Sequence, residues 1–245
     1  ITGATIPIRR ESEVTADLPR IFVGQSARMR SLMPSFDWSS LGHDGIVIRT
    51  YGRDLVLAGG QPRGTLYAIY TFLEDVVGCR WWTSTESYIP RKATLSVDDF
   101  DVTYVPPLAY REAYYRDTMT TGLFAVKMKL NGENQPLPER YGGHYRILGW
   151  VHTFFQLLPP EKYFKDHPDW YSEINGKRMS ERSQLCLTNQ DMRKELTRVA
   201  LEWIKANPDA GIISISQNDW LGKCECAKCC ALEEEEGSPS GPLIH

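Results

Sequence analysis

The stretch that decides the fold of the first part of the chain is Gly45-Ile-Val-Ile-Arg-Thr-Tyr-Gly-Arg-Asp-Leu-Val-Leu-Ala-Gly-Gly60. The sequence pattern has a period of two residues on both sides of Tyr51-Gly52-Arg53. Such alternation around a short turn predicts two strands, 45–50 and 54–58, that pair as a hairpin.

A helix is predicted directly after this hairpin, because one apolar stripe recurs at helical spacing: Leu66, Tyr70, Leu73 and Val77. Gly78 falls where a left-handed residue ends a helix. Further strands are expected at 6–10, 20–23 and 93–97, and a helix at about 25–33. Residues 1–103 are therefore predicted to form a small α+β N-terminal domain, a sheet with packed helices.

The two prolines of Tyr104-Val105-Pro106-Pro107 predict a stiff connector. The order of the predicted elements changes after it. From there strand and helix predictions alternate, as in a parallel sheet or barrel. We expect strands at 108–115, 125–130, 148–155 and 211–216, a helix at 191–206, and a hairpin at 170–179 around Asn175-Gly176. Residues 108–245 are thus predicted to be the first part of a (β/α)₈ TIM-like barrel, in an α/β protein and a chain that continues beyond His245.

Composition excludes some classes of partner. With 42% hydrophobic and 24% charged residues the chain is of ordinary globular composition. A formal net charge of −3 shows no basic excess of the kind typical of nucleic-acid binders, and no apolar run reaches the roughly 20 residues that span a bilayer. We expect no nucleic-acid partner and no membrane span. We expect a secreted or periplasmic protein whose signal peptide is not present in this chain, which starts at Ile1.

Asp219 is the candidate catalytic residue. It follows the predicted strand 211–216, and the catalytic groups of barrels gather where strands end. Cleavage of a glycosidic bond needs a carboxylic acid that protonates the leaving oxygen, usually with a second carboxylate that the sequence does not identify. The alternative is that Asp219 caps a turn, as Asn-Asp pairs often do.

Four further residues near the predicted strand ends are candidates for substrate binding. Trp150 and Trp220 offer flat apolar faces that suit sugar rings. His152 can bond sugar hydroxyls, and Asn218 lies beside the candidate acid. The alternative for each is a structural role, because most aromatic side chains fill cores and many histidines are bonded within the protein.

Cys224-Glu-Cys226-Ala-Lys-Cys229-Cys230 places four thiols in seven residues. That number suits a structural zinc site with Cys224, Cys226 and Cys229 as ligands, although zinc ligands usually come as two separated pairs. The alternative is disulfide bonds, with Cys186 or Cys79 as partners, in an exported protein. The predicted chemistry itself requires no cofactor.

Two parts of the sequence resemble known families. The segment Gly59-Gly60-Gln-Pro-Arg-Gly64-Thr-Leu-Tyr-Ala68-Ile-Tyr70-Thr-Phe-Leu73 resembles the N-terminal domain of family 20 hexosaminidases and family 67 α-glucuronidases, where it precedes a catalytic barrel. The second part resembles a large bacterial family with the same N-terminal domain and no assigned reaction. The motifs that carry this second resemblance are Val151–Phe154, His167–Trp170, Asn175–Arg178, Leu185–Asn189 and Ser216–Asp219.

The resemblance to hexosaminidases implies roles for particular residues. Arg111 matches an arginine that grips sugar hydroxyls, and the segment that ends in Asn131 resembles the second barrel strand. Where that family has an Asp-Glu pair, this chain has Asn218-Asp219. We therefore expect a glycoside hydrolase acting on a polysaccharide or glycan, with uronic or N-acetylated sugars among its candidates. The alternatives are a non-catalytic carbohydrate-binding protein with a degenerate barrel and a metal-stabilised scaffold.

Overall fold

The computed structural model describes residues 1–14 and 18–244 of the chain. These residues form two compact units, 1–145 and 146–245, and each unit is described by itself. The predicted boundary at 103–108 thus falls inside the first unit. The reason is that residues 108–145 pack against the helix of the N-terminal sheet and belong to the same core.

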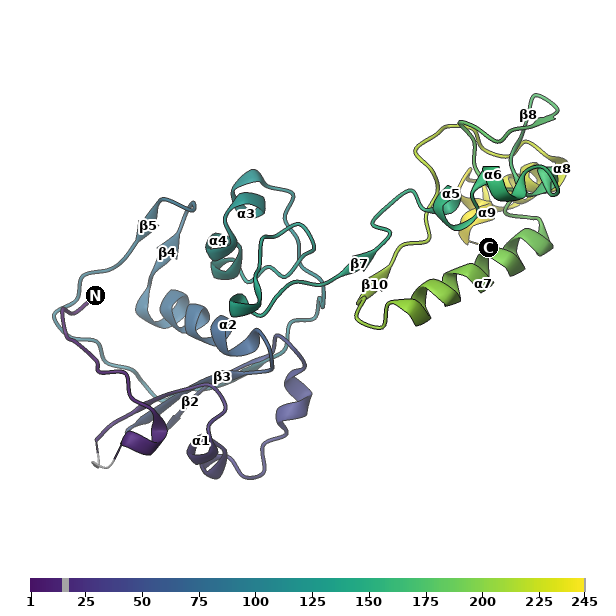
Figure 1. The fold of residues 1–245 in the computed structure, drawn as a ribbon. Coiled ribbons are helices and arrows are strands. Elements are labelled where there is room, and N and C mark those ends of the chain that lie inside the picture. Colours follow the sequence, from purple (N-terminus) through teal and green to yellow (C-terminus); the bar gives the residue numbers. More distant parts are fainter. Residues whose placement is uncertain (15–17, 245) are drawn as a thin grey trace. The chain divides into compact units, whose positions relative to one another are not determined.

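The first unit is built on a four-stranded mixed sheet (Figure 1). The predicted hairpin is present, since β2 (Ile46–Tyr51) and β3 (Asp54–Gly59) pair antiparallel with Tyr51 opposite Asp54. One edge strand is parallel to β3, and the other edge strand is antiparallel to β2. In spatial order the strands are β1 (Ile21–Val23), β3 (Asp54–Gly59), β2 (Ile46–Tyr51) and β6 (Asp101–Tyr104). The strands predicted at 6–10 and 93–97 did not form, and β6 pairs at the sheet edge instead.

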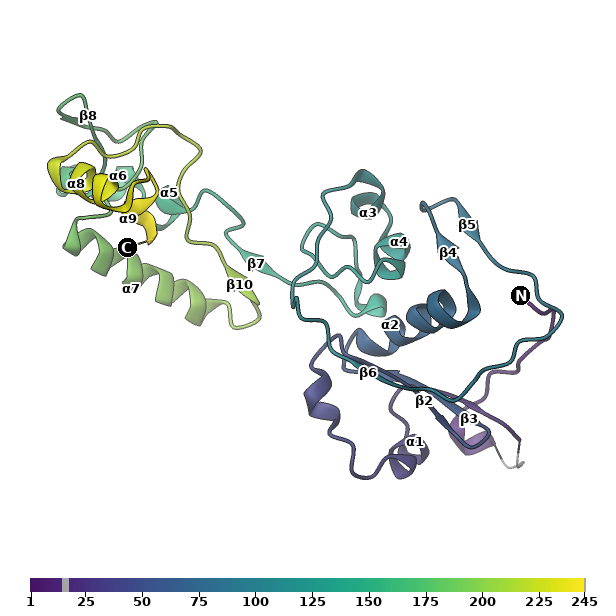
Figure 2. The same cartoon turned by 180° about the vertical axis from the view of Figure 1, so that it is seen from behind.

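Alternation along the hairpin sends side chains to two cores, one on each face of the sheet. Ile48 and Leu57 face α2 (Gly64–Thr71), which continues as a π-helical stretch, η3 (Phe72–Val77). Val47 and Val56 face the opposite side and pack with α1 (Ala27–Leu32) and η2 (Trp38–Leu41). Figure 2 shows the same layers from behind. Both sheet faces are therefore covered.

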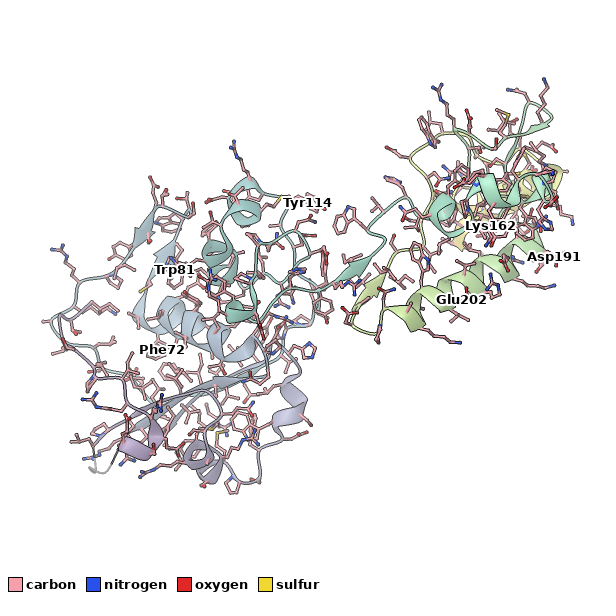
Figure 3. The ribbon with its side chains drawn as sticks, viewed as in Figure 1. Phe72, Trp81, Tyr114, Lys162, Asp191 and Glu202 are labelled. Atoms are coloured by element: carbon pink, nitrogen blue, oxygen red, sulfur yellow. The ribbon has the colours of Figure 1, made fainter. Side chains whose placement is uncertain are left out.

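Helix α2 is buried on more than the predicted stripe. Tyr67 and Ala68 of α2 and Phe72 and Val77 of η3 are buried, while Leu66 and Tyr70 are only partly buried. Phe72 and Trp81 share this core, and both are labelled in Figure 3. The helix needs apolar residues all round because the sheet covers one side, and α3 (Arg116–Thr120) and α4 (Gly122–Lys127) lie across the other (Figure 1). Gly78 ends the helix with φ of 93°, as predicted.

The two strands predicted between residues 108 and 130 are wrong. Residues 108–115 have no regular structure, and 125–130 begin inside helix α4. The consecutive residues Phe124, Ala125 and Val126 are all buried. A short apolar run of this kind is equally consistent with a buried helix and a buried strand. The remaining short elements of this unit are η1 (Glu11–Glu13), β4 (Arg80–Trp81), β5 (Ser87–Tyr88) and η4 (Glu139–Tyr141).

The second unit contains a pair of parallel strands, β7 (Ile147–Leu148) and β10 (Ile212–Ile213), connected through α7 (Gln190–Ala206). Helix α7 confirms the predicted helix, and Asn189 caps it by accepting bonds from two backbone amides. The hairpin around Asn175-Gly176 is confirmed as β8 (Glu173–Ile174) and β9 (Lys177–Arg178). The other elements are α5 (Phe154–Leu157), α6 (Pro160–Tyr163), η5 (Pro168–Trp170), α8 (Ala227–Glu236) and α9 (Gly241–Ile244).

The strand predicted at 148–155 stops at Leu148. Gly149, Trp150 and His152 have positive φ angles, which strand geometry does not allow, and α5 starts at Phe154. Core residues of α5, α7 and the segment 163–171 pack together, while Asp191 and Glu202 mark the solvent side of α7 (Figure 3). The protein is of the α/β class, and its described residues form no closed barrel. In the same residues no helix has the length and apolar character needed to cross a membrane.

Candidate functional site

Residues after the two parallel strands of the second unit form a shared rim. Thr153 and Ser216 connect them, because the amide of each residue donates to an oxygen of the other, at 3.1 and 2.9 Å. His152 is bonded here as well, since its amide donates to Ser216 Oγ at 2.8 Å and its Nδ1 lies 2.9 Å from the carbonyl oxygen of Gln217. In open α/β sheets the carboxyl ends of parallel strands are the usual place for ligands.

The loop that follows Ser216 is fixed by the buried side chain of Gln184. Its amide nitrogen donates to the carbonyl oxygens of Asn218 and Trp220 at 2.8 and 2.6 Å, and its Oε1 accepts from the amide of Asn218 at 2.8 Å. The predicted substrate ligand Asn218 is used within the protein, because its side chain donates to Ser183 and accepts from Phe155. Asn218 is thus a positioning residue in this structure.

The remaining predicted residues of the rim are exposed. The carboxylate of Asp219 makes no hydrogen bond or ion pair within residues 1–14 and 18–244, so the structure gives it no capping role there. The side chains of Trp150 and Trp220 are 37% and 52% exposed. Asp219 and Trp220 are adjacent on a fixed loop, and that arrangement leaves an acid and an indole face open to a ligand.

A groove of about 850 Å³ opens beside this loop. Trp220 lines it together with Phe155 of α5, Phe164 after α6, and two charged residues, Glu181 and Arg182. The guanidinium of Arg182 lies 5.7 Å from the centre of the Trp220 ring. The groove therefore combines aromatic faces with polar groups, which is the usual character of a site for a small organic ligand.

Arg111 and Asn131 lie in the first unit and are used there by a buried polar network. The carboxylate of Asp44 accepts from Arg63, Arg111 and Asn131 at 2.6, 2.9 and 2.6 Å. The guanidinium of Arg111 also donates to the carbonyl oxygens of Leu108 and Lys129, and Asn131 has no exposed surface. Both residues hold segment 108–131 against the sheet domain, so the structure gives them a structural role in place of the predicted sugar contact.

Four cysteines of the second unit bring their sulfur atoms together. Cys186, Cys224, Cys226 and Cys229 have Sγ atoms that all lie within 4.8 Å of one another. Cys186 Sγ is 3.7 Å from that of Cys226 and 3.8 Å from that of Cys229. Sulfurs that bind one zinc ion tetrahedrally at about 2.3 Å lie about 3.8 Å apart, whereas a disulfide bond is about 2.05 Å long. The separations match a four-thiolate metal site.

The surroundings of this cluster suit thiolates. The amide of Glu173 donates to Cys224 Sγ at 3.4 Å, and a guanidinium nitrogen of Arg178 lies 3.8 Å from the same atom. Hydrogen bonds with Cys224 and Cys229 lower the pKa of Cys186, while their bonds with Cys186 raise the pKa of the other two. Donors that surround ligand atoms in this way are typical of metal centres.

The structure corrects the predicted ligand set. Cys186, expected only as a disulfide partner, completes the group, and Cys230 is exposed and bonds to the carbonyl of Glu225. All six cysteines are free, with Cys79 buried in the first unit. Sequence reasoning missed Cys186 as a member of this group because α7 separates it from the others. It also missed Gln184, although this residue directly precedes the quoted motif Leu185–Asn189, which contains Cys186.

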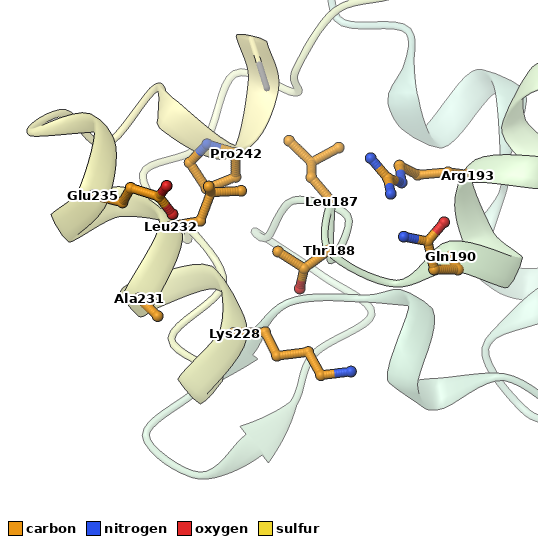
Figure 4. A pocket seen from close by; sticks show the side chains of 9 residues that line it. All are labelled: Leu187, Thr188, Gln190, Arg193, Lys228, Ala231, Leu232, Glu235 and Pro242. Carbon is orange, nitrogen blue, oxygen red and sulfur yellow. The ribbon is translucent and has the colours of Figure 1, made fainter.

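A pocket of about 370 Å³ lies next to the cluster, between α8 and the start of α7 (Figure 4). Leu187, Leu232 and Pro242 give it an apolar lining, and Arg193 reaches its edge. Thr188 also lines it, and its hydroxyl lies 3.2 Å from Cys229 Sγ. This threonine is therefore the direct link between the pocket and the thiols.

Fold and site together define an α/β protein with a four-cysteine metal-site geometry and an exposed polar rim after two parallel strands. The model of the family described as "Domain of unknown function (DUF4838)" matches residues 81–245. Since this match covers more than half of the chain, the protein belongs to that family. No curated protein and no solved structure matches the chain significantly.

Proposed function

We propose that residues 146–245 hold one structural zinc ion and that the loops it fixes belong to the substrate-binding face of a glycoside hydrolase. The observation that carries the metal proposal is the convergence of four sulfurs within 4.8 Å of one another, with Cys186 Sγ at 3.7 and 3.8 Å from the sulfurs of Cys226 and Cys229. Four sulfurs at these separations suit a single ion and leave no room for a cluster of several iron atoms. Four-thiolate sites of this kind are typical of structural zinc.

The ion would connect segments that are far apart in the sequence. Cys186 follows the hairpin β8–β9, and the other three ligands come from the loop after Trp220 and the first turn of α8. Arg178 would offset part of the negative charge of the four thiolates. The role is structural, because four protein ligands leave a zinc ion no open position for a substrate.

Metal analysis of the purified protein tests this assignment. We expect one zinc ion per chain, lost in Cys186→Ser and retained in the matched control Cys230→Ser, whose thiol lies outside the cluster. Thermal melts of the two variants should differ by several degrees, because loss of a structural metal removes folding free energy. Equal zinc content in both variants, or none in the wild-type protein, would rule the site out.

The glycosidase proposal is supported by the resemblance to hexosaminidases and by the exposed carboxylate of Asp219, which precedes the exposed Trp220 and makes no hydrogen bond or ion pair within the described residues. In this proposal Asp219 protonates the oxygen of the leaving sugar, as a general acid must. Hydrolysis of a panel of aryl glycosides, including uronides and N-acetylhexosaminides, provides the assay. Asp219→Asn should lower kcat by about 10²–10⁴-fold, while Glu202→Gln, an exposed carboxylate on α7, should leave it unchanged. Glycan binding without hydrolysis would favour the non-catalytic alternative.

A further inference from the structure

We propose that the groove beside Trp220 is a subsite for a neutral, polyhydroxylated oligosaccharide. This inference rests on the glycoside-hydrolase function proposed above and specifies the class of ligand that this face binds. The volume of about 850 Å³ lies within the usual range for ligand sites. Three separate segments line the groove, α5–α6, residues 180–182 and Trp220.

The backbone that carries Trp220 is held in place by contacts within the second unit. Trp220 is 52% exposed, yet its carbonyl oxygen is bonded to the buried side chain of Gln184. The neighbouring segment is fixed as well, because a Cβ on Gly222 would lie 2.4 Å from the carbonyl oxygen of Arg182. An indole on a fixed backbone has only two side-chain torsions to order, so it loses little conformational entropy when it stacks on a ligand, and its apolar surface suits the C–H face of a sugar.

Four charged side chains complete the groove, Glu161, Lys165, Glu181 and Arg182, and all four are exposed. In the part of the chain that the structure describes, none of them makes a hydrogen bond or an ion pair. Carboxylates only accept hydrogen bonds and the two cations only donate them. A sugar hydroxyl does both at once, so a ligand with adjacent hydroxyls can satisfy groups of both kinds.

The balance of charge selects among sugars. Two carboxylates and two cations give the groove no net charge, so it has no electrostatic preference for a polyanion. A uronic acid would bring its carboxylate close to Glu161 or Glu181, and like charges that meet in a binding site reduce affinity. The groups therefore favour a neutral sugar chain over an acidic one.

Titration calorimetry tests the subsite, with the Asp219→Asn protein used to prevent turnover. The probes are hexasaccharides of glucose, xylose and N-acetylglucosamine, with a galacturonate hexamer as the acidic comparison. We expect at least one neutral hexamer to bind more tightly than the galacturonate. An added Trp220→Ala should weaken that binding at least tenfold, and Glu181→Gln should weaken it too. Trp82→Ala should have no effect, because Trp82 is also an exposed indole, at 62%, but lies in the first unit.

Three results would overturn the subsite: no binding of any neutral hexamer, tighter binding of the galacturonate, or less than a threefold effect of Trp220→Ala. Circular dichroism of each variant checks that the fold is retained, and the exposed position of Glu181 makes its variant a second, independent probe. The readout is affinity, so it is separate from the hydrolysis assay. If Asp219→Asn left hydrolysis intact, the catalytic proposal would fail while the binding result stood.

Discussion

Replacement of Gln184 by leucine should release the loop that carries Asp219 and Trp220. The side chain is 4% exposed and makes three hydrogen bonds with that loop. Each bond contributes about 1 kcal/mol net, so their loss should reduce the local stability of the loop by about 3 kcal/mol. That free energy corresponds to roughly a 100-fold increase in amide exchange rate.

Hydrogen exchange measures this effect directly, because the amide of Asn218 donates to Gln184 Oε1. Mass spectrometry of a peptide that covers residues 217–222 follows this amide and the adjacent bond from Trp220 to Asn218. Gln190→Leu, an exposed glutamine at the start of α7, is the matched control and should change exchange little. If exchange at Asn218 stayed within threefold of wild type in Gln184→Leu, the loop would be held by other contacts and the reasoning would be wrong.

Three further changes probe other parts of the protein. Asp44→Asn removes a buried carboxylate that pairs with two arginines, and it should destabilise the first unit by about 3 kcal/mol or more, as read from urea unfolding. Gly222→Ala places a methyl group against backbone, and the expected loss of about 1–3 kcal/mol would appear in a thermal melt of the second unit. A hydrogen bond from Arg198 lowers the pKa of Glu195 to about 2. Since this value lies below the ordinary 4.5, the ionised group stabilises the fold above pH 4.5, and the stabilisation is lost as the pH falls toward 2. Glu195→Gln should therefore cost under about 1 kcal/mol at pH 7 and nothing at pH 2, and an NMR titration of Glu195 with a midpoint near 4.5 would contradict the assignment.

Local patterns predicted the elements whose partners are close in sequence. The hairpin β2–β3, helix α7 and the turn at Asn175-Gly176 all carry their own signals of alternation, capping or turn formation. The predictions failed where tertiary contacts decide. Residues 124–126 are buried because a helix of the same unit lies beside them, and the strand after Leu148 is broken by backbone angles that its side chains do not reveal.

For the candidate site, too, the sequence predicted the residues with local signals and missed those that depend on distant contacts. Asp219 and Trp220 were predicted as site residues because they follow the predicted strand 211–216, of which Ile212–Ile213 forms β10, and three of the four clustered cysteines were found because they are close in sequence. The roles of Arg111 and Asn131 depend on Asp44, which is 67 and 87 residues away from them. No spacing rule connects positions so far apart, and their participation in one network becomes visible only in three dimensions.

The separation of the cysteines along the sequence also sets the order in which parts of this protein can fold during synthesis. Cys186 and Cys226 are 40 residues apart, and the whole of α7 lies between them. On the ribosome the first unit, which ends at residue 145, can fold while the second is still being translated. The thiol of Cys186 stays without its three partners until the start of α8 has emerged, so the four-sulfur group forms only after α7 has been translated.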